Sequence, residues 1–268
     1  MSKLNIKIPL FSIVTVCYNS EKTIERTIKS VLAQQYTNYE YIIVDGGSTD
    51  RTLDIVKNYE PLFEGRMKWK SEPDKGIYDA FNKGIWRSKG TYVWIVNSDD
   101  FIAVDALDCL KNVINRYEKG TEPILSCALN YYDEKSGKIT GKHFYNAKDA
   151  KRIYKMDAVG VVHPATLVPK RIYEEEGGFD DRYKLSGDCD WFHRVYKRGC
   201  PFAFIDHIVT NMSNAGISGQ WNMKRYKISR NDKKLYFKKF YSNPIESYTR
   251  FLIWNLMFFR VMIKMKLK

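Results

Sequence analysis

Three short apolar runs divide the first hundred residues. Phe11–Val16, Tyr39–Val44 and Tyr92–Val96 are rich in strand-forming residues, are too short for long helices, and each stops at a polar group. Between the first two runs, apolar residues recur at helical spacing and predict a helix from about Glu21 to Gln34, with Ile24, Ile28, Val31 and Leu32 on one face. Repeated strand, turn and helix units indicate a parallel sheet with right-handed crossovers.

The second half alternates in the same way with less regularity. An amphipathic pattern between Phe101 and Lys119 predicts a helix, and a strand is expected at Ile124–Leu129. The polar stretch Asp133–Gly141 is typical of a hairpin turn. A short strand at Leu167–Pro169 and a helix that begins near Asp188 follow.

Composition indicates a globular protein of enzyme size. The 268 residues are 44% hydrophobic and 15% aromatic, which is ample for a core. The five cysteines form no CxxC pair, so neither a disulfide framework nor a zinc site is indicated. The first residues, MSKLNIKIPL, do not resemble a signal peptide and pass directly into a strand. We therefore expect a reducing compartment, most simply the cytosol.

The net charge of +13 lies almost entirely in the last 48 residues. Residues 221–268 contain 13 basic and 2 acidic side chains, a net charge of +11, whereas residues 1–220 contain 31 basic and 29 acidic side chains, a net charge of +2. A basic tail on a nearly neutral body does not support nucleic-acid binding as the main function.

The tail combines basic pairs with an apolar run at Phe251–Ile263. Thirteen residues that include Asn255 and Arg260 are too few to cross a bilayer, which requires about 20 apolar residues. We expect a helix that lies on a membrane surface, and a helix that packs on the catalytic domain is the alternative.

Carboxylates follow the third strand directly, in the order Asn97-Ser98-Asp99-Asp100. The carboxyl edge of a parallel sheet is where open α/β folds bind ligands. A divalent cation held there by one or two carboxylates can also bind substrate phosphates. Capping of the next turn is the simpler alternative for this pair.

Five blocks in order carry a resemblance to a known family. VTVCYN, YIIVDGGSTDRT, SEPDKGIYDAFNKGI, GTYVWIVNSDD and the later HPATLVPKRIYEEEGGFDDRYKLSGDCDW resemble the successive motifs of the family 2 glycosyltransferases, which have the GT-A fold. The wording of these blocks is most similar to the bacterial branch that builds O-antigen and capsular polysaccharides.

The resemblance implies a nucleotide site in the first hundred residues. Asp45 matches the aspartate that accepts a hydrogen bond from uracil, which suits an acceptor-only carboxylate. For Asp45 alone, a turn former that ends the strand is the alternative. The segment Cys17, Tyr18 and Asn19 would flank the base. The family pattern points four polar side chains of the third block towards the nucleotide-sugar: Asp74, Tyr78, Asp79 and Asn82. For Asp79 and Asn82, a solvated helix face is the alternative.

The resemblance also implies a metal and a catalytic base. Asp100 is expected to bind Mn²⁺ or Mg²⁺, with Asp99 contacting the metal or the ribose. Many relatives have DxDD where this chain has Asn97-Ser98-Asp99-Asp100, so one carboxylate is missing.

Asp188 falls where the family has its general base, although local sequence alone favours a helix cap for it. Asp190 is the alternative base, and we expect Cys189 to be a core thiol rather than a nucleophile. A role for His163 or His207 is left open.

The expected fold class is α/β: a GT-A fold with a Rossmann-like, mainly parallel sheet flanked by helices, and a C-terminal helical extension. We expect a catalytic domain over residues 1–220, with a nucleotide half at about 1–100 and an acceptor half at about 101–220, followed by a basic extension over 221–268. The expected function is inverting transfer of a sugar from a UDP-sugar to a glycan or lipid-linked glycan at the inner face of the plasma membrane. A sugar-nucleotide nucleotidyltransferase and a nucleic-acid-binding protein are the alternatives.

Overall fold

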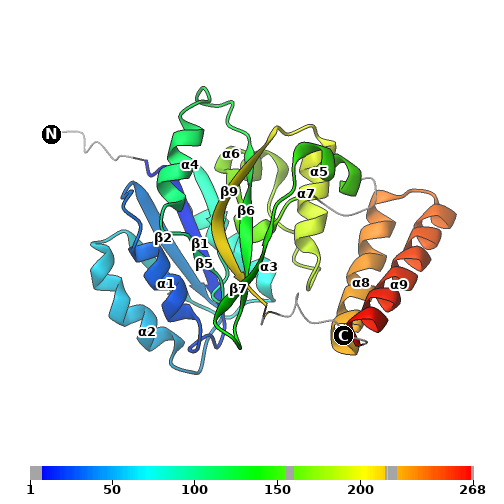
Figure 1. Cartoon of the computed structure of the whole chain (residues 1–268), viewed down its shortest axis with the longest axis horizontal. Helices are drawn as coiled ribbons and strands as arrows, with labels where there is room; N and C mark the ends of the chain where they lie inside the picture. The colour runs from blue at the N-terminus through cyan, green and yellow to red at the C-terminus, as the bar shows by residue number, and fades with distance from the viewer. Residues whose placement is uncertain (1–7, 155–159, 215, 217–221, 267–268) are drawn as a thin grey trace.

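The computed structural model describes residues 8–154, 160–214, 216 and 222–266. Among these residues a single nine-stranded sheet runs through the molecule, with helices on both of its faces (Figure 1). The strand order is β3-β2-β1-β4-β8-β6-β9-β5, and β7 pairs with β6 outside this path. The α/β class predicted from the sequence is confirmed.

The first half of the chain builds the parallel part of the sheet. Strands β3, β2, β1 and β4 lie side by side and all run in the same direction. The elements are β1 (Phe11–Cys17), α1 (Ile24–Leu32), β2 (Tyr39–Asp45), α2 (Thr52–Tyr59), η1 (Glu60–Phe63), β3 (Met67–Ser71), α3 (Ile77–Arg87) and β4 (Tyr92–Ile95). The three strands and the first helix that the hydrophobic pattern predicts are all present, within a few residues at each end.

The second half makes the sheet mixed. Strand β8 runs antiparallel to β4, and β6 is antiparallel to β8 and β7 but parallel to β9. The elements are β5 (Phe101–Ile102), α4 (Ala106–Ile114), β6 (Ile124–Asp133), β7 (Lys138–His143), α5 (Ala147–Tyr154), η2 (His163–Ala165), β8 (Thr166–Pro169), α6 (Lys170–Glu176), α7 (Gly187–Lys197) and β9 (Phe202–Ser213). The pairing is therefore parallel throughout the first half and mixed in the second half, where β6 and β9 are parallel. The predicted hairpin is β6–β7.

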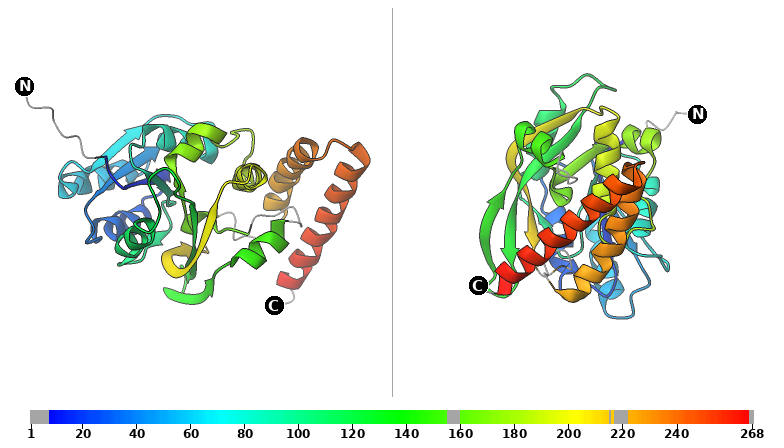
Figure 2. Two further views of the ribbon diagram at one scale, coloured as in Figure 1. Left: turned by 90° about the horizontal axis from the view of Figure 1, so that it is seen from above. Right: turned by 90° about the vertical axis from the view of Figure 1, so that its right-hand side faces the viewer.

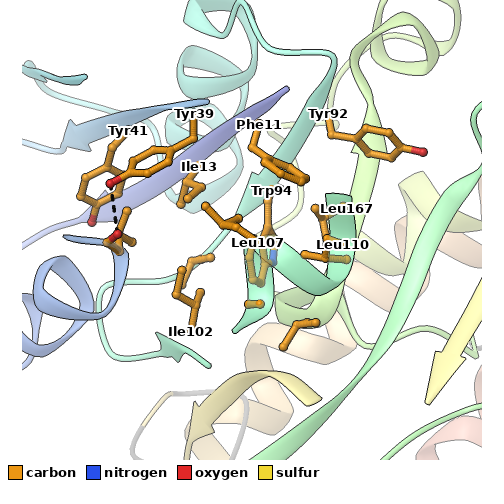
Figure 3. Packing of buried hydrophobic residues seen from close by; sticks show 14 of the residues in the cluster. Phe11, Ile13, Tyr39, Tyr41, Tyr92, Trp94, Ile102, Leu107, Leu110 and Leu167 are labelled. Carbon is orange, nitrogen blue, oxygen red and sulfur yellow. Dashed lines mark hydrogen bonds between the residues drawn. The ribbon is translucent and has the colours of Figure 1, made fainter. Parts of the chain in front are cut away.

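Alternation along the strands divides the core into two clusters. In β1, Phe11 and Ile13 face a cluster that includes α1 and α4, whereas Val14 and Val16 face a second cluster built with α3, α6 and α7. Figure 3 shows the first cluster, in which Trp94 lies among Leu107, Leu110 and Leu167. Both faces of the central strands are thus covered, as the continuous apolar runs require.

Two helices follow the sheet, α8 (Met223–Phe240) and α9 (Pro244–Lys266). Both views of Figure 2 show them lying side by side on one flank of the molecule. Tyr236 and Phe237 of α8 are buried in the second cluster with Trp191 of α7. The predicted extension is thus helical, and α8 packs against the sheet domain.

Candidate active site

Polar residues gather where the parallel strands end. Cys17 and Asp45 are direct neighbours at the carboxyl ends of β1 and β2, and Ser71 at the end of β3 lies beside Asp45. Residues 97–100 follow β4, which pairs with the other side of β1. The parallel order therefore brings the predicted nucleotide and metal residues to one edge of the sheet.

Asp45 is fully buried beneath its loop. Its Oδ2 accepts hydrogen bonds from the backbone N–H of Gly47 (3.0 Å), the N–H of Ser48 (2.9 Å) and the hydroxyl of Ser71 (2.6 Å). Its Oδ1 accepts the Ser48 hydroxyl at 2.5 Å. Burial opposes ionisation of Asp45, but these donors outweigh burial and lower its pKa. The structure thus places Asp45 as an organiser of the loop, in agreement with the turn-forming alternative for this residue.

An accessible carboxylate lies directly above this loop. Gly46 has no side chain, and a Cβ built there would meet Asp74 Oδ2 at 2.4 Å and the Tyr18 ring at 3.5 Å. The Tyr18 side chain is 63% exposed, and Asp74 is half-buried with Oδ1 accepting the Gly76 N–H at 2.8 Å. Tyr18, Gly46 and Asp74 therefore form a shelf, an open aromatic face beside a hydrogen-bond acceptor.

Cys17 and Asn19 form hydrogen bonds with the end of β2 and the loop after it. The Cys17 thiol is buried 3.5 Å from Asp45 Oδ1, and burial followed by the Asp45 charge raises its pKa far above the usual value. Asn19 adopts a left-handed backbone with φ of 49°, and its Oδ1 accepts the Thr49 N–H at 2.8 Å. Both side chains thus bond the end of β1 to the end of β2 and the loop after it.

Helix α3 carries the remaining predicted nucleotide residues, and their side chains face different ways. The Tyr78 ring is buried against Phe81 and Phe179, with ring centroids 5.7 and 5.6 Å away. Asp79 accepts the Lys75 N–H at 3.0 Å and pairs with Lys83 at 3.1 Å.

Asn82 binds both the N–H and the carbonyl of Phe179 at 2.8 Å. Its amide is committed to the chain, and the nucleotide-sugar contact expected for it is not supported.

The residues that follow β4 carry oxygen atoms, and these residues differ in their exposure to solvent. Asp100 is 2% exposed, and its carboxylate accepts the Ser213 N–H at 2.9 Å and the Asn97 amide at 3.2 Å. Asp99 is less buried, and Asn97 Oδ1 is enclosed without a hydrogen-bond partner among the described residues. Burial raises the pKa of Asp99 and of Asp100, and the charge of Asp99 raises that of Asp100 further. The geometry therefore favours Asp99 over the expected Asp100 as a metal ligand.

These atoms fit an incomplete cation site. Within the part of the chain that the structure describes, no three His, Cys, Asp or Glu side chains are grouped to hold a metal. A Mg²⁺ ion in a phosphate site is typically held by one or two carboxylates, with water and substrate phosphate as its remaining ligands. The donor set therefore fits a cation that arrives with a diphosphate.

The predicted base is brought to the same edge from the second half of the chain. Asp188 lies in the first turn of α7, where its Oδ1 accepts the Tyr78 hydroxyl at 3.4 Å and the Cys189 N–H at 2.8 Å. Asp190 is fully buried and bound by Tyr183 and Lys239, which excludes it as an accessible base. Burial and then Asp188 raise the pKa of the Cys189 thiol to about 12, as expected for a core thiol.

The two histidines left open by the sequence lie in different places. His163 packs between Phe81 and Phe192, and its Nε2 is enclosed without a hydrogen-bond partner among the described residues. Burial lowers the pKa of His163, and the charge of Asp188 opposes that shift. Phe81 also contacts Tyr78, the residue whose hydroxyl reaches Asp188. His207 pairs with Asp105 at 3.1 Å and is six residues along β9 from Ser213, about 20 Å at 3.3 Å per residue.

Sequence reasoning missed several residues that shape the site. Ser71 ends β3, a partly buried strand that the hydrophobic pattern of the sequence did not reveal. Ser98 bonds Ser20 across the site at 2.9 Å, and Arg26 donates to the Asp99 carbonyl at 2.7 Å. No local pattern marks these two contacts, because each joins residues more than 70 positions apart. The segment Ser213–Ser218 has a glycine and serine pattern that is similar to the loop closing the domain in family 2 glycosyltransferases, and it lies partly outside the described residues.

Comparison with known proteins adds a family and a fold. The family model Glycosyl transferase family 2 matches residues 12–192. An uncharacterized glycosyltransferase of Mycobacterium tuberculosis is 41% identical over 93 residues, a match that covers 34% of each chain. A PGL/p-HBAD biosynthesis glycosyltransferase of Mycobacterium bovis is 26% identical over 207 residues, covering 77% of each chain. The chain thus matches only about a third of the first relative's length.

Two solved structures share the architecture. The Staphylococcus aureus TarS structure in complex with UDP-GlcNAc has a TM-score of 0.65 at 19% identity, covering 83% of this chain and 65% of that one. The Pyrobaculum calidifontis mannosyltransferase PcManGT in complex with GDP-Man and Mn²⁺ has a TM-score of 0.59 at 17% identity, covering 88% of this chain and 65% of that one. These likenesses support the expected GT-A fold.

Proposed function

The chain belongs to glycosyl transferase family 2, and on that premise we propose that it is an inverting glycosyltransferase that moves one sugar from a UDP-sugar to an acceptor hydroxyl. The observation that carries this proposal is the contact between Tyr78 and Asp188. Tyr78 belongs to α3, which follows the nucleotide shelf, and Asp188 belongs to α7 of the acceptor half. The proposed nucleotide site and the proposed base would therefore lie at the same edge of the sheet.

The shelf is proposed to bind the base. The open Tyr18 ring offers a stacking surface, and the missing side chain at Gly46 leaves room for a ligand or for Asp74 beside it. Asp74 can accept a hydrogen bond from the ring N–H of uracil, because an ionised carboxylate only accepts. The complex of TarS with UDP-GlcNAc supports a UDP-sugar as donor.

The residues after β4 are proposed to receive the diphosphate. Asp99, with Asn97 Oδ1 beside it, would hold Mn²⁺ or Mg²⁺, and the Mn²⁺ complex of PcManGT supports this choice of ion. When bound, such a cation stabilises the negative charge that develops on the departing UDP. Asp100 fixes the turn by binding the Ser213 N–H and the Asn97 amide.

Asp188 is proposed to act as the general base. Its carboxylate takes the proton of the acceptor hydroxyl while that oxygen forms a bond to the anomeric carbon and the bond from this carbon to the UDP oxygen breaks. Attack from the face opposite UDP inverts the anomeric configuration. The Tyr78 hydroxyl and the Cys189 N–H orient the carboxylate, and burial of Asp190 leaves Asp188 as the accessible acid of this turn.

A glycan or lipid-linked glycan is proposed as acceptor, in bacterial cell-surface polysaccharide synthesis such as that of O-antigen or capsule. No helix among the described residues is long and apolar enough to span a membrane. The outer face of α9 nevertheless exposes Leu252, Leu256 and Ile263 beside Arg260 and Lys264. We propose that this face attaches the enzyme peripherally to the inner surface of the plasma membrane, where a lipid-linked acceptor would be reached.

Replacement of the base tests the reaction directly. We expect Asp188→Asn to bind UDP as the wild type does and to lose turnover by about a hundredfold or more, since general bases contribute about 10²–10⁴-fold. Purified enzyme is incubated with UDP-glucose, UDP-galactose, UDP-GlcNAc and UDP-GalNAc, and release of UDP is measured with water as acceptor. A variant that releases UDP at the wild-type rate would disprove the assignment of Asp188.

A further inference from the structure

The loop that delivers Asp188 is held by a helix from the far end of the chain. Three consecutive backbone N–H groups donate to the Asp232 carboxylate: Lys184 at 3.1 Å, Leu185 at 2.7 Å and Ser186 at 2.8 Å. Asp232 lies on α8 and is only 3% exposed. A single buried side chain thus binds the whole segment that leads into α7.

This segment has few other ways to satisfy its N–H groups. Ser186 precedes the first residue of α7, and within the described chain its side chain makes no capping hydrogen bond. Backbone N–H groups that are removed from water need a hydrogen-bond acceptor, so the loop conformation depends on the carboxylate of α8. The distance between these residues in the sequence, 46 to 48 positions, makes this a tertiary contact rather than a local cap.

The opposite side of the loop is closed by Tyr78. A Cβ at Gly187 would lie 2.8–2.9 Å from atoms of the Tyr78 ring, closer than real Cβ contacts. Tyr78 is 4% exposed and its hydroxyl reaches Asp188. The residues just before the base are therefore clamped between the Tyr78 ring and Asp232.

A second contact from α8 fixes the turn just after the base. Lys239 Nζ lies 2.7 Å from Asp190 Oδ1, and Arg194 Nε lies 3.2 Å from Asp190 Oδ2. Asp190 is fully buried two residues beyond Asp188. Helix α8 thus binds the backbone ahead of Asp188 and the side chain that follows it.

We propose that Asp232 is a positioning residue for catalysis, and that α8 holds the base loop in its productive geometry. This inference rests on the proposed role of Asp188. Asp232 does not touch substrate in this account. It acts through Leu185 and Ser186, and displacement of a catalytic group by about 1 Å can cost up to about a hundredfold in rate.

The test compares kcat with donor binding in the full-length protein. Asp232→Asn replaces one acceptor oxygen with an amide donor that faces backbone N–H groups, and Asp232→Glu moves the carboxylate by one methylene. We expect Asp232→Asn to lower kcat for UDP-sugar hydrolysis by about tenfold or more. The donor KM and the calorimetric Kd for UDP should stay within about twofold of wild type, because the shelf and Asp99 are untouched.

Tyr236→Phe is the matched control. Tyr236 is buried on the same helix and its hydroxyl bonds His193, away from the base loop. It should lower the melting temperature while leaving kcat unchanged, which separates loss of stability from loss of positioning. If Asp232→Asn does not fold, Asp232→Glu carries the same expectation with a smaller fall in kcat.

Three results would overturn the inference. The first is a wild-type kcat in the folded Asp232 variant. The second is a fall in kcat that is no larger than the fall in the fraction of the protein that binds UDP. The third is an equal fall in Tyr236→Phe. Asp188→Asn is measured in parallel: if it is inactive while Asp232→Asn is fully active, only the positioning role fails, whereas an active Asp188→Asn removes the base assignment itself.

Discussion

At the scale of single residues, two aspartates at one loop differ in what surrounds them. Asp45 accepts four hydrogen bonds of 2.5–3.0 Å from Gly47, Ser48 and Ser71 and is fully buried. Asp74 accepts one backbone N–H and lies against the bare backbone of Gly46. The first is placed to hold the loop, and the second is placed to meet a ligand.

Alanine at each position should separate these roles. We expect Asp74→Ala to weaken UDP binding by about 10–100-fold, since a hydrogen bond to a charged group is worth about 1.5–3 kcal/mol, with little loss of stability. Asp45→Ala leaves several buried donors without a partner and should lower the free energy of unfolding by about 3 kcal/mol or more. Urea unfolding and calorimetry with UDP measure the two effects. Normal UDP affinity in Asp74→Ala, with lost affinity in folded Asp45→Ala, would restore the role first expected for Asp45.

The sequence could predict which residue types gather at the site but not which of them face outward. The motif around Asp45 marks a ligand-binding loop, yet burial of Asp45 depends on Ser71 of β3, which the hydrophobic pattern did not reveal. Likewise, Asp99 and Asp100 are adjacent in the chain, and the hydrogen bond from Ser213 of β9 to Asp100 is a distant contact that distinguishes them. Contacts over 26 and 113 positions carry no local signal.

At the scale of elements, the hydrophobic pattern predicted a strand correctly where all residues of that strand are buried. β1 and β2 are buried on both faces and read as continuous apolar runs, so they were predicted within one residue. β3 and β9 are only partly buried, and because they mix apolar and polar residues, the hydrophobic pattern did not predict them. The tail was predicted as one basic extension, but α8 buries Tyr236 and Phe237 whereas α9 exposes an apolar outer face.

The outer face of α9 gives a prediction for membrane binding. Leu256 is 71% exposed, and Asn231 on α8 is also exposed, so Leu256→Glu and Asn231→Glu change the charge equally. Insertion of a leucine into a bilayer is worth about 1.5–3 kcal/mol, whereas one charge near an anionic surface is worth about 1 kcal/mol. We expect Leu256→Glu to weaken binding to phosphatidylglycerol vesicles by about tenfold or more and Asn231→Glu by about fivefold or less.

Co-sedimentation with vesicles measures this difference, and phosphatidylcholine vesicles provide the uncharged reference. Equal losses in the two variants would mean that charge alone attaches the protein. Unchanged binding in both would mean that α9 does not contact the membrane.

At the scale of the whole molecule, α8 joins the tail to the catalytic domain. Phe237 is 3% exposed within the cluster that contains Trp191 of α7 and Phe81 of α3. The domain boundary expected at residue 220 therefore marks a change in charge. We propose that α8 and the sheet domain before it unfold as one unit.

Removal of the Phe237 ring tests whether α8 and the sheet domain unfold together. Deletion of a buried phenylalanine costs about 3–5 kcal/mol, so Phe237→Ala should shift the single unfolding transition of the whole protein to lower urea. Leu256→Ala on the exposed face of α9 is the control and should leave the midpoint almost unchanged. Two separate transitions, with only the smaller one moved by Phe237→Ala, would show that the tail folds independently.

For the molecule as an enzyme, we propose that the carboxyl edge of the sheet binds a uridine diphosphate together with a divalent cation. The most direct measurement is calorimetric titration of the full-length protein with UDP, with and without Mn²⁺, alongside GDP and the Asp99→Ala variant. We predict that UDP binds tightly only with Mn²⁺, that GDP binds at least about tenfold more weakly, and that Asp99→Ala abolishes the effect of the metal. Failure of the folded protein to bind UDP, or equal affinity for UDP with and without Mn²⁺, would contradict this account of the site.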